Sequence, residues 1–96
     1  MAKESSLERR IKRYAESKGC FFWKFVAPGT KGVPDRILIT KEGEIAFLEI
    51  KAPGEKPKAI QEYRMLQLRD RKVGALWTDS YALAVAFIDG LCNPKL

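Results

Sequence analysis

Apolar and charged residues follow a helical pattern in the first part of the chain. Over residues 5–18 the apolar side chains recur at helical spacing and most other positions are charged, which predicts a surface helix that packs through one stripe. Gly19 ends this pattern, and the aromatic, β-rich residues 20–26 predict a strand. Lys24 interrupts one face of that strand, either as an edge charge that discourages aggregation or as a contact to a phosphate.

A loop and a hairpin are predicted next. Residues 28–32 contain a proline and two glycines and are typical of a mobile loop. Pro34 suits the start of a strand, where its missing N–H costs least. The apolar residues 36–40 and 44–51 flank a Lys-Glu-Gly turn and predict an antiparallel hairpin. Because these strands are almost continuously apolar, we expect a sheet covered on both faces.

The last part of the chain predicts two helices and a short strand. Residues 52–57 form a loop with two prolines and a glycine, and a helix is expected over residues 58–72, ended by Gly74. Residues 75–78 predict a strand, and Asp79 with Ser80 caps a final apolar helix over residues 81–89, closed by Gly90. The predicted order is helix, three strands, helix, strand, helix.

Composition limits the chain to one domain, residues 1–96. Its 96 residues are 46% hydrophobic and 31% charged, as in a globular protein, and its apolar runs are far shorter than a membrane span. The net charge is +6 and the pI is near 9.5. Clustered Lys and Arg release counterions from phosphate backbones, so this charge favours a polyanionic partner such as nucleic acid.

The N-terminal residues are the feature that indicates a chain kept inside a reducing cell. The N-terminus has no secretory signal pattern, so we expect Cys20 and Cys92 to be free thiols. The chain has no histidine and no paired-cysteine spacing, which argues against structural zinc.

Three charged residues stand near strand positions, where a small core has least use for charge. Asp35 precedes the first strand of the hairpin, and Glu49 and Lys51 lie near the end of the second. Alternate side chains leave the same face of a strand, so Glu49 and Lys51 share a face and Ile50 turns into the core. Two carboxylates about 4 Å apart would repel by about 4 kcal/mol at an effective dielectric near 20, which a divalent cation would relieve. The structural alternative pairs Glu49 with Lys51 or Arg36 and lets Asp35 cap a turn.

Mg²⁺ or Mn²⁺ would suit this oxygen-rich set, because no soft ligand is near. Such an ion polarises a phosphodiester oxygen and activates water. Lys51 would stand beside that water, but an unperturbed lysine is a poor base at neutral pH. It is therefore either the base or a residue that orients the nucleophile or stabilises the developing charge.

Two helical polar residues are further candidates, each with a structural alternative. Glu8 stands in capping-box spacing from Ser5, yet it also projects at the margin of the apolar stripe and can face the sheet. Gln61 lies on the apolar side of the second predicted helix. It either looks inward toward the acids or bonds water at the rim.

Three motifs taken together resemble the virus-type replication-repair nuclease (VRR-Nuc) domain, a branch of the PD-(D/E)XK phosphodiesterases. These are the Gly-Val-Pro-Asp-Arg run at 32–36, the Glu-Ile-Lys-Ala-Pro-Gly run at 49–54, and Gln61. Asp35 with Glu-X-Lys alone is a weak signal, whereas the ordered set is fairly specific. The resemblance extends from about Leu7 to Ser80.

The resemblance implies a restriction-endonuclease-like α/β fold with a central mixed four-stranded sheet flanked by helices, in α-β-β-β-α-β-α order. It also implies Mg²⁺- or Mn²⁺-dependent cleavage of DNA. Asp35, Glu49 and the Ile50 carbonyl would hold the metal, and Lys51 would lie near the attacking water. Glu8 matches the first-helix acid of the family, and Gln61 matches its helical glutamine.

The resemblance further implies a branched substrate, such as a four-way (Holliday) junction in replication, recombination or repair, and a homodimer acting inside a bacterium or a phage-infected host. The aromatic strand or the last helix would form the dimer contact. The alternatives are a nuclease for flap, nicked or single-stranded DNA, and a basic DNA-binding module without catalysis. The candidate DNA contacts are Lys24, Lys31, Arg36, Lys56 and Lys58.

Overall fold

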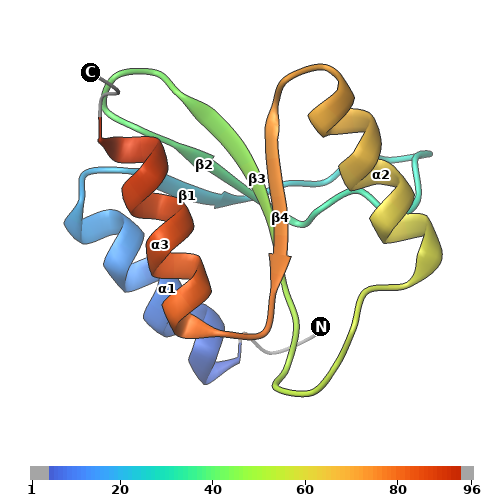
Figure 1. The fold of residues 1–96 in the computed structure, drawn as a ribbon, viewed down its shortest axis with the longest axis horizontal. Coiled ribbons are helices and arrows are strands. Elements are labelled where there is room, and N and C mark those ends of the chain that lie inside the picture. Colours follow the sequence, from blue (N-terminus) through green and yellow to red (C-terminus); the bar gives the residue numbers. More distant parts are fainter. Residues whose placement is uncertain (1–4, 94–96) are drawn as a thin grey trace.

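A mixed sheet of four strands with helices on both sides organises the protein (Figure 1). The computed structural model describes residues 5–93. Within that range the elements follow the predicted order and are α1 (Ser6–Ser17), β1 (Phe21–Lys24), β2 (Arg36–Ile39), β3 (Ile45–Ile50), α2 (Ala59–Asp70), β4 (Gly74–Thr78) and α3 (Tyr81–Cys92). The predicted fold class is therefore confirmed.

The strands lie in the order β1-β2-β3-β4, so that β2, which Asp35 directly precedes, and β3, which carries Glu49, are in the middle. The pairs β1–β2 and β2–β3 are antiparallel, and β3–β4 is parallel. A parallel pair needs a crossover connection, which α2 supplies. Leu48 on β3 consequently lies between Arg36 on β2 and Leu76 on β4.

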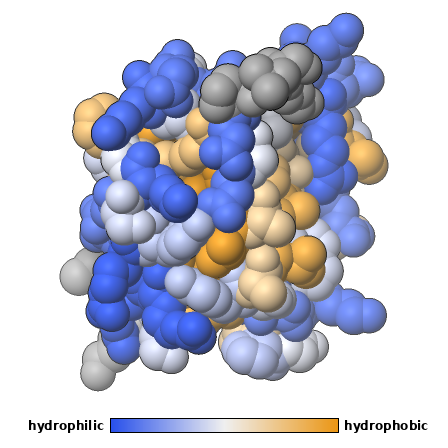
Figure 2. All heavy atoms as spheres, turned by 60° about the vertical axis from the view of Figure 1, so that its left-hand side comes forward, coloured by the Kyte–Doolittle hydropathy of each residue, from blue (hydrophilic) through white to orange (hydrophobic). Residues whose placement is uncertain are grey.

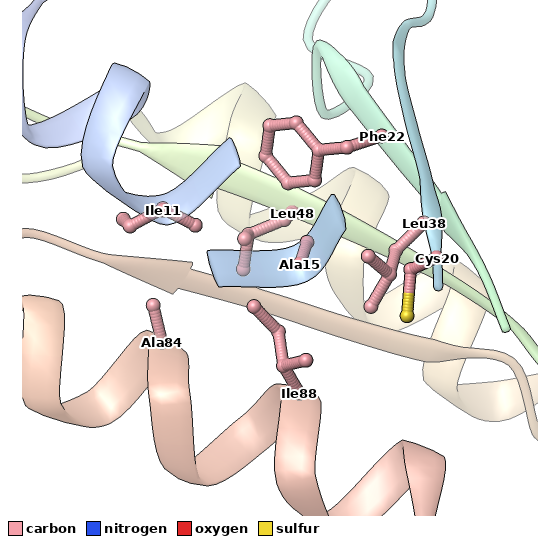
Figure 3. Close-up of a cluster of buried hydrophobic side chains, with 8 residues drawn as sticks. All are labelled: Ile11, Ala15, Cys20, Phe22, Leu38, Leu48, Ala84 and Ile88. Atoms are coloured by element: carbon pink, nitrogen blue, oxygen red, sulfur yellow. The ribbon is translucent and has the colours of Figure 1, made fainter. Parts of the chain in front are cut away.

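The main core lies between one face of the sheet and the helices α1 and α3 (Figure 3). The two helices contribute Ile11, Ala15, Ala84 and Ile88, which are fully buried. From the sheet side, Phe22, Leu38 and Leu48 meet them. Ile50 packs against the same cluster, so it turns into the core between Glu49 and Lys51 as predicted.

The other face of the sheet is only partly covered, which corrects the expectation of cover on both faces. Helix α2 packs on β4, and Figure 1 shows it on the side away from α1 and α3. Phe21 and Trp23 on the edge strand β1 stack with ring centroids 4.7 Å apart, and each remains 54% exposed. The nearly continuous apolarity of the strands therefore reflects burial on one face of the sheet and an open apolar surface on part of its other face.

The end of α3 also differs from the prediction. The helix does not stop before Gly90 but continues to Cys92, because Leu91 and Cys92 pack against the core and stabilise the added turn. Both cysteines are free, and their Sγ atoms lie 3.3 Å apart. Burial is the main cause that raises the pKa of Cys20 to about 12, so this thiol is inert at neutral pH.

Hydrophilic side chains cover most of the face shown in Figure 2, and apolar surface gathers near its centre. Among residues 5–93, no helix has both the length and the apolar character required to cross a membrane.

Candidate active site

The loop before β2 fixes the position of Asp35. Pro34 is buried, and the backbone N–H of Phe25, just after β1, donates to the Asp35 carbonyl at 2.8 Å. Gly29 and Gly32 both have positive φ angles, 83° and 85°. Glycine populates this region without steric cost, so the loop can turn twice before it delivers Asp35 to the start of β2.

The two glycines provide a matched test of how tightly this loop packs. A Cβ on Gly32 would lie 2.7 Å from Ile60 Cγ1 and 2.9 Å from the Ile60 carbonyl oxygen, whereas a Cβ on Gly29 would meet open space. Positive φ alone costs a non-glycine residue about 1–2 kcal/mol. We expect Gly32→Ala to lower the free energy of unfolding by more than Gly29→Ala does, as measured by urea denaturation. Equal losses in the two variants would show that the loop does not press on α2.

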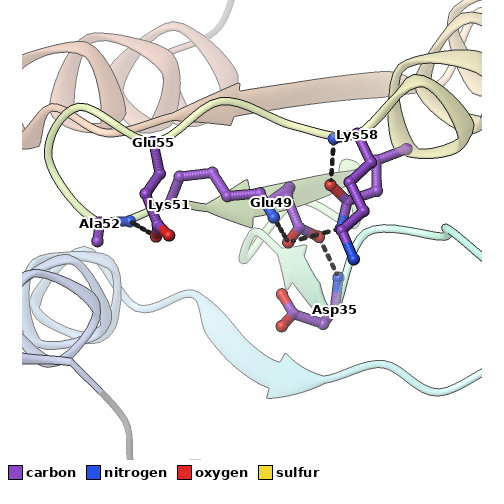
Figure 4. A network of polar contacts seen from close by, with 7 residues as sticks. Asp35, Glu49, Lys51, Ala52, Glu55 and Lys58 are labelled. Atoms are coloured by element: carbon purple, nitrogen blue, oxygen red, sulfur yellow. Dashed lines mark hydrogen bonds and ion pairs between the residues drawn. The ribbon is translucent and has the colours of Figure 1, made fainter.

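Glu49 is the centre of the polar network shown in Figure 4. Only 6% of this residue is exposed. Its Oε1 accepts from the Asp35 N–H at 3.2 Å, and its Oε2 lies 3.5 Å from both Lys51 Nζ and Gln61 Nε2. Charge-assisted hydrogen bonds are normally 2.7–2.9 Å long. The carboxylate is therefore withdrawn from water yet held only by long contacts.

Both carboxylic acids have raised pKa values. Desolvation is the largest cause that raises the pKa of Glu49, followed by the nearby charge of Asp35, and Lys51 opposes the shift. Desolvation is also the largest cause that raises the pKa of Asp35. The charge of Glu8 raises this pKa further, whereas Arg36 and Lys24 lower it. Asp35 is itself an exposed residue, so the surrounding protein shields it from only part of the solvent. Asp35 thus interacts unfavourably with two other acids, Glu8 and Glu49.

These shifts predict how the stability of the metal-free protein depends on pH. Between the ordinary carboxyl pKa values and the raised ones, the folded protein keeps protons that the unfolded chain has released. Stability must therefore fall as the pH rises through that interval. We expect Glu49→Gln to reduce this fall and to raise the unfolding temperature at neutral pH in EDTA, by about 4–8 °C for each kcal/mol gained. Parallel stability–pH curves for parent and variant would contradict the assigned cause.

Glu8 faces the sheet rather than closing a capping box. Its backbone N–H donates to the N-cap residue Ser5 at 3.0 Å, but its carboxylate lies 2.7 Å from Arg36 Nε. Arg36 is 2% exposed, and its guanidinium also lies over the Phe22 ring, 5.1 Å from the centroid. The prediction that Arg36 contacts DNA is therefore not supported, because a buried and ion-paired guanidinium cannot reach a phosphate.

Gln61 contacts both the start of its own helix and the carboxylate of Glu49. Its Oε1 accepts from the backbone N–H of Lys58 at 2.8 Å, at the start of α2, while its Nε2 points to Glu49 at 3.5 Å. The carbonyl must face the N–H donor, so the amide group must face the carboxylate. The hydrogen bond between Gln61 and the Lys58 N–H was not predicted from the sequence. Its signal in the sequence is a glutamine three residues after the residue that begins the helix.

The remaining candidate DNA contacts are all exposed, and they are Lys24, Lys31, Lys56 and Lys58. Lys24 lies close enough to lower the pKa of Asp35, so its charge acts at the site. The backbone carbonyl of Lys31 accepts from Arg64 Nε at 2.7 Å, which ties the glycine loop to α2.

The site fits a hydrated divalent cation better than a fully protein-coordinated one. In the described part of the chain, no three His, Cys, Asp or Glu side chains form a ligand cluster. Asp35 and Glu49 would supply two carboxylates and the Ile50 carbonyl a third oxygen. Mg²⁺ usually keeps several waters and binds one or two carboxylates, so this donor set is adequate. The positive charge of a cation would also favour the ionised carboxylates and so oppose the rise in their pKa values.

Two comparisons with known proteins found proteins that are similar in fold or sequence. The chain is 27% identical to a solved structure described as "VRR_NUC domain", with a TM-score of 0.74, and the match covers 88% of this chain and 97% of the other. It is also 43% identical over 61 residues to "Putative nuclease p44" of Acyrthosiphon pisum secondary endosymbiont phage 1. That match covers 64% of this chain and 66% of the phage protein, just under two thirds of it. No protein-family model matches the chain.

Proposed function

The chain belongs to the VRR-Nuc family of nuclease domains, and from that premise we propose that it is a divalent-metal-dependent endonuclease that hydrolyses phosphodiester bonds in DNA. The observation that carries this proposal is the state of Glu49, which is 6% exposed and held only by contacts of 3.2–3.5 Å. Burying a carboxylate without strong partners costs several kcal/mol. Function accounts for that cost better than stability does.

Asp35, Glu49 and the Ile50 carbonyl would hold the Mg²⁺ or Mn²⁺. When bound, the ion polarises a phosphodiester oxygen and lowers the pKa of a coordinated water. Gln61 keeps the Glu49 carboxylate in place through its amide group, and Glu8 with Arg36 closes the side of the site next to α1. Exposed Lys24, Lys31, Lys56 and Lys58 would contact the DNA backbone.

Lys51 is the residue that would act nearest the attacking water. Its Nζ lies 3.5 Å from Glu49 Oε2, so its ammonium group is directed toward the carboxylate rather than into solvent. A positive charge here stabilises negative charge that develops on the phosphoryl oxygens. Arginine at position 51 would keep the charge without being able to act as a base, so cleavage by Lys51→Arg would assign the lysine an electrostatic role.

We propose branched DNA, including four-way junctions, as the substrate and a homodimer as the active form inside the cell. One chain carries one site, so two symmetric cuts require two copies. The exposed, stacked Phe21 and Trp23 on the edge strand favour β1 as the contact, whereas Leu83 is the large apolar side chain exposed on α3. Sedimentation of the parent and of Trp23→Glu tests this, since a monomeric parent would reject the dimer.

The substrate and metal dependence are tested together with labelled four-way junction, flap, nicked duplex, intact duplex and single strand. Each is incubated with Mg²⁺, Mn²⁺ or EDTA. We expect cleavage only with metal, and fastest cleavage of the junction. Faster cleavage of flap or single strand would move the substrate assignment to those structures. Metal-independent binding without cleavage of any substrate would instead favour a basic binding module.

A further inference from the structure

A cavity of about 310 Å³ lies between α2 and the partly open face of the sheet. Its apolar lining includes Phe25 and Phe47, which meet edge to face with ring centroids 5.0 Å apart, and the side chain of Leu68 from α2. Arg64 and Arg71 also line it. The lining thus combines an aromatic floor with two cationic side chains, and it contains no acidic residue.

The cavity is adjacent to the carboxylates. Phe47 lies two residues before Glu49 on β3, so their side chains leave the same face of the sheet, about 7 Å apart along the strand. Val33 and Pro34 line the cavity and directly precede Asp35. A nucleotide next to one bound at the acids could therefore reach the cavity without leaving that face.

The two arginines have different roles in the lining. Arg64 is half-buried and already engaged, because its Nε donates to the Lys31 carbonyl at 2.7 Å and its Nη1 donates to Gln67 at 2.9 Å. Arg71 follows the last turn of α2 and is exposed. A guanidinium in this position can contact a phosphate or stack on a planar base.

We propose that this cavity receives an unpaired nucleobase from the DNA strand that passes the carboxylates. The proposal rests on the proposed nuclease function and adds a subsite to it. Every base has a π-face that stacks on aromatic side chains without sequence preference. The cationic, acid-free lining favours a base that carries its phosphate over a neutral apolar peptide segment. Branched and single-stranded DNA supply such bases, whereas intact duplex keeps them stacked.

The test measures binding in EDTA, where metal-dependent cleavage cannot occur. The probes are a short labelled oligothymidylate and the same sugar-phosphate backbone without bases, which carries equal charge. We expect the parent to bind the oligothymidylate about 5- to 150-fold more tightly, the range for stacking of one base. Phe25→Leu should reduce this preference several-fold, while Phe87→Leu, at a half-buried phenylalanine of α3 outside the cavity, should leave it unchanged.

A second pair of variants protects the test against misfolding. Arg71→Gln and Arg13→Gln each remove one charge from an exposed helical or helix-end position, and only Arg71 lines the cavity. We expect Arg71→Gln alone to weaken binding of the oligothymidylate. An equal base preference in the parent, Phe25→Leu and Arg71→Gln would overturn the subsite even if the parent cleaves DNA. A base preference that depends on Phe25 would support it even if no cleavage is found.

Discussion

Glu49→Gln is expected to lower DNA cleavage by at least about 100- to 1000-fold, the loss seen when one preorganised electrostatic group is removed from an active site. Glutamine keeps the size and shape of the side chain and can still accept from the Asp35 N–H, now 3.2 Å away. It removes the negative charge that would hold a divalent cation. Single-turnover cleavage of the preferred substrate with saturating Mg²⁺ measures the effect.

The matched control for this prediction is Glu44→Gln. Glu44 directly precedes the same strand, at the end away from Glu49, and is exposed. Both substitutions replace a glutamate by glutamine, so they change the net charge equally. We expect Glu44→Gln to cleave at the parent rate and Glu49→Gln to bind DNA at least as tightly as the parent. Because Glu49→Gln should also be no less stable than the parent, unfolding would not explain its inactivity. Parent-like cleavage by Glu49→Gln would reject Glu49 as a metal ligand.

Arg36→Met is expected to lower the free energy of unfolding by about 3 kcal/mol. Removing one partner of a buried ion pair typically costs about 3–5 kcal/mol, and the lower end applies because 15% of the Glu8 side chain remains exposed. Without the guanidinium, Glu8 would be left close to Asp35, whose pKa it already raises. Most small domains are stable by only about 5–15 kcal/mol, so the loss would be large. Urea denaturation with an unchanged slope measures it.

Two further variants separate the ion pair from other effects of this substitution. The double variant Glu8→Gln with Arg36→Met removes the unpaired charge and should recover a substantial part of the loss. Lys24→Met, at the position paired with Arg36 across β1 and β2, removes an exposed charge and should change stability by less than about 0.5 kcal/mol. A double variant as unstable as Arg36→Met alone would show that lost packing against Phe22, not the charge, dominates.

The features that the sequence predicts well are those set by neighbouring residues. The β2–β3 hairpin follows from two apolar runs around a glycine turn, and Glu49, Ile50 and Lys51 alternate as a strand requires. The site acids Asp35 and Glu49 are brought together because both lie on this hairpin. The sequence also placed Lys51 and Gln61 near Glu49, but it could not give the distances of these contacts.

The features that could not be predicted depend on tertiary contacts. Arginine before an apolar strand is typical of an exposed strand end, and only the packing of α1 against β1 buries Arg36 beside Glu8. The extension of α3 beyond Gly90 depends on the core contacts of Cys92. The open face near Phe21 and Trp23 reflects where α2 lies on the sheet. In each case the local pattern was compatible with two environments, and the fold selected one.

The two contacts of Gln61 couple the start of α2 to the state of the Glu49 carboxylate. One amide group accepts from the Lys58 N–H and donates toward Glu49, so neutralising or ligating the carboxylate changes the restraint on that amide. The helix start lies on the chain segment between Lys51 and α2, which is exposed through most of its length. Hydrogen exchange at the Lys58 N–H, read by NMR as Mg²⁺ is added, would therefore follow occupancy of the acids without any DNA present.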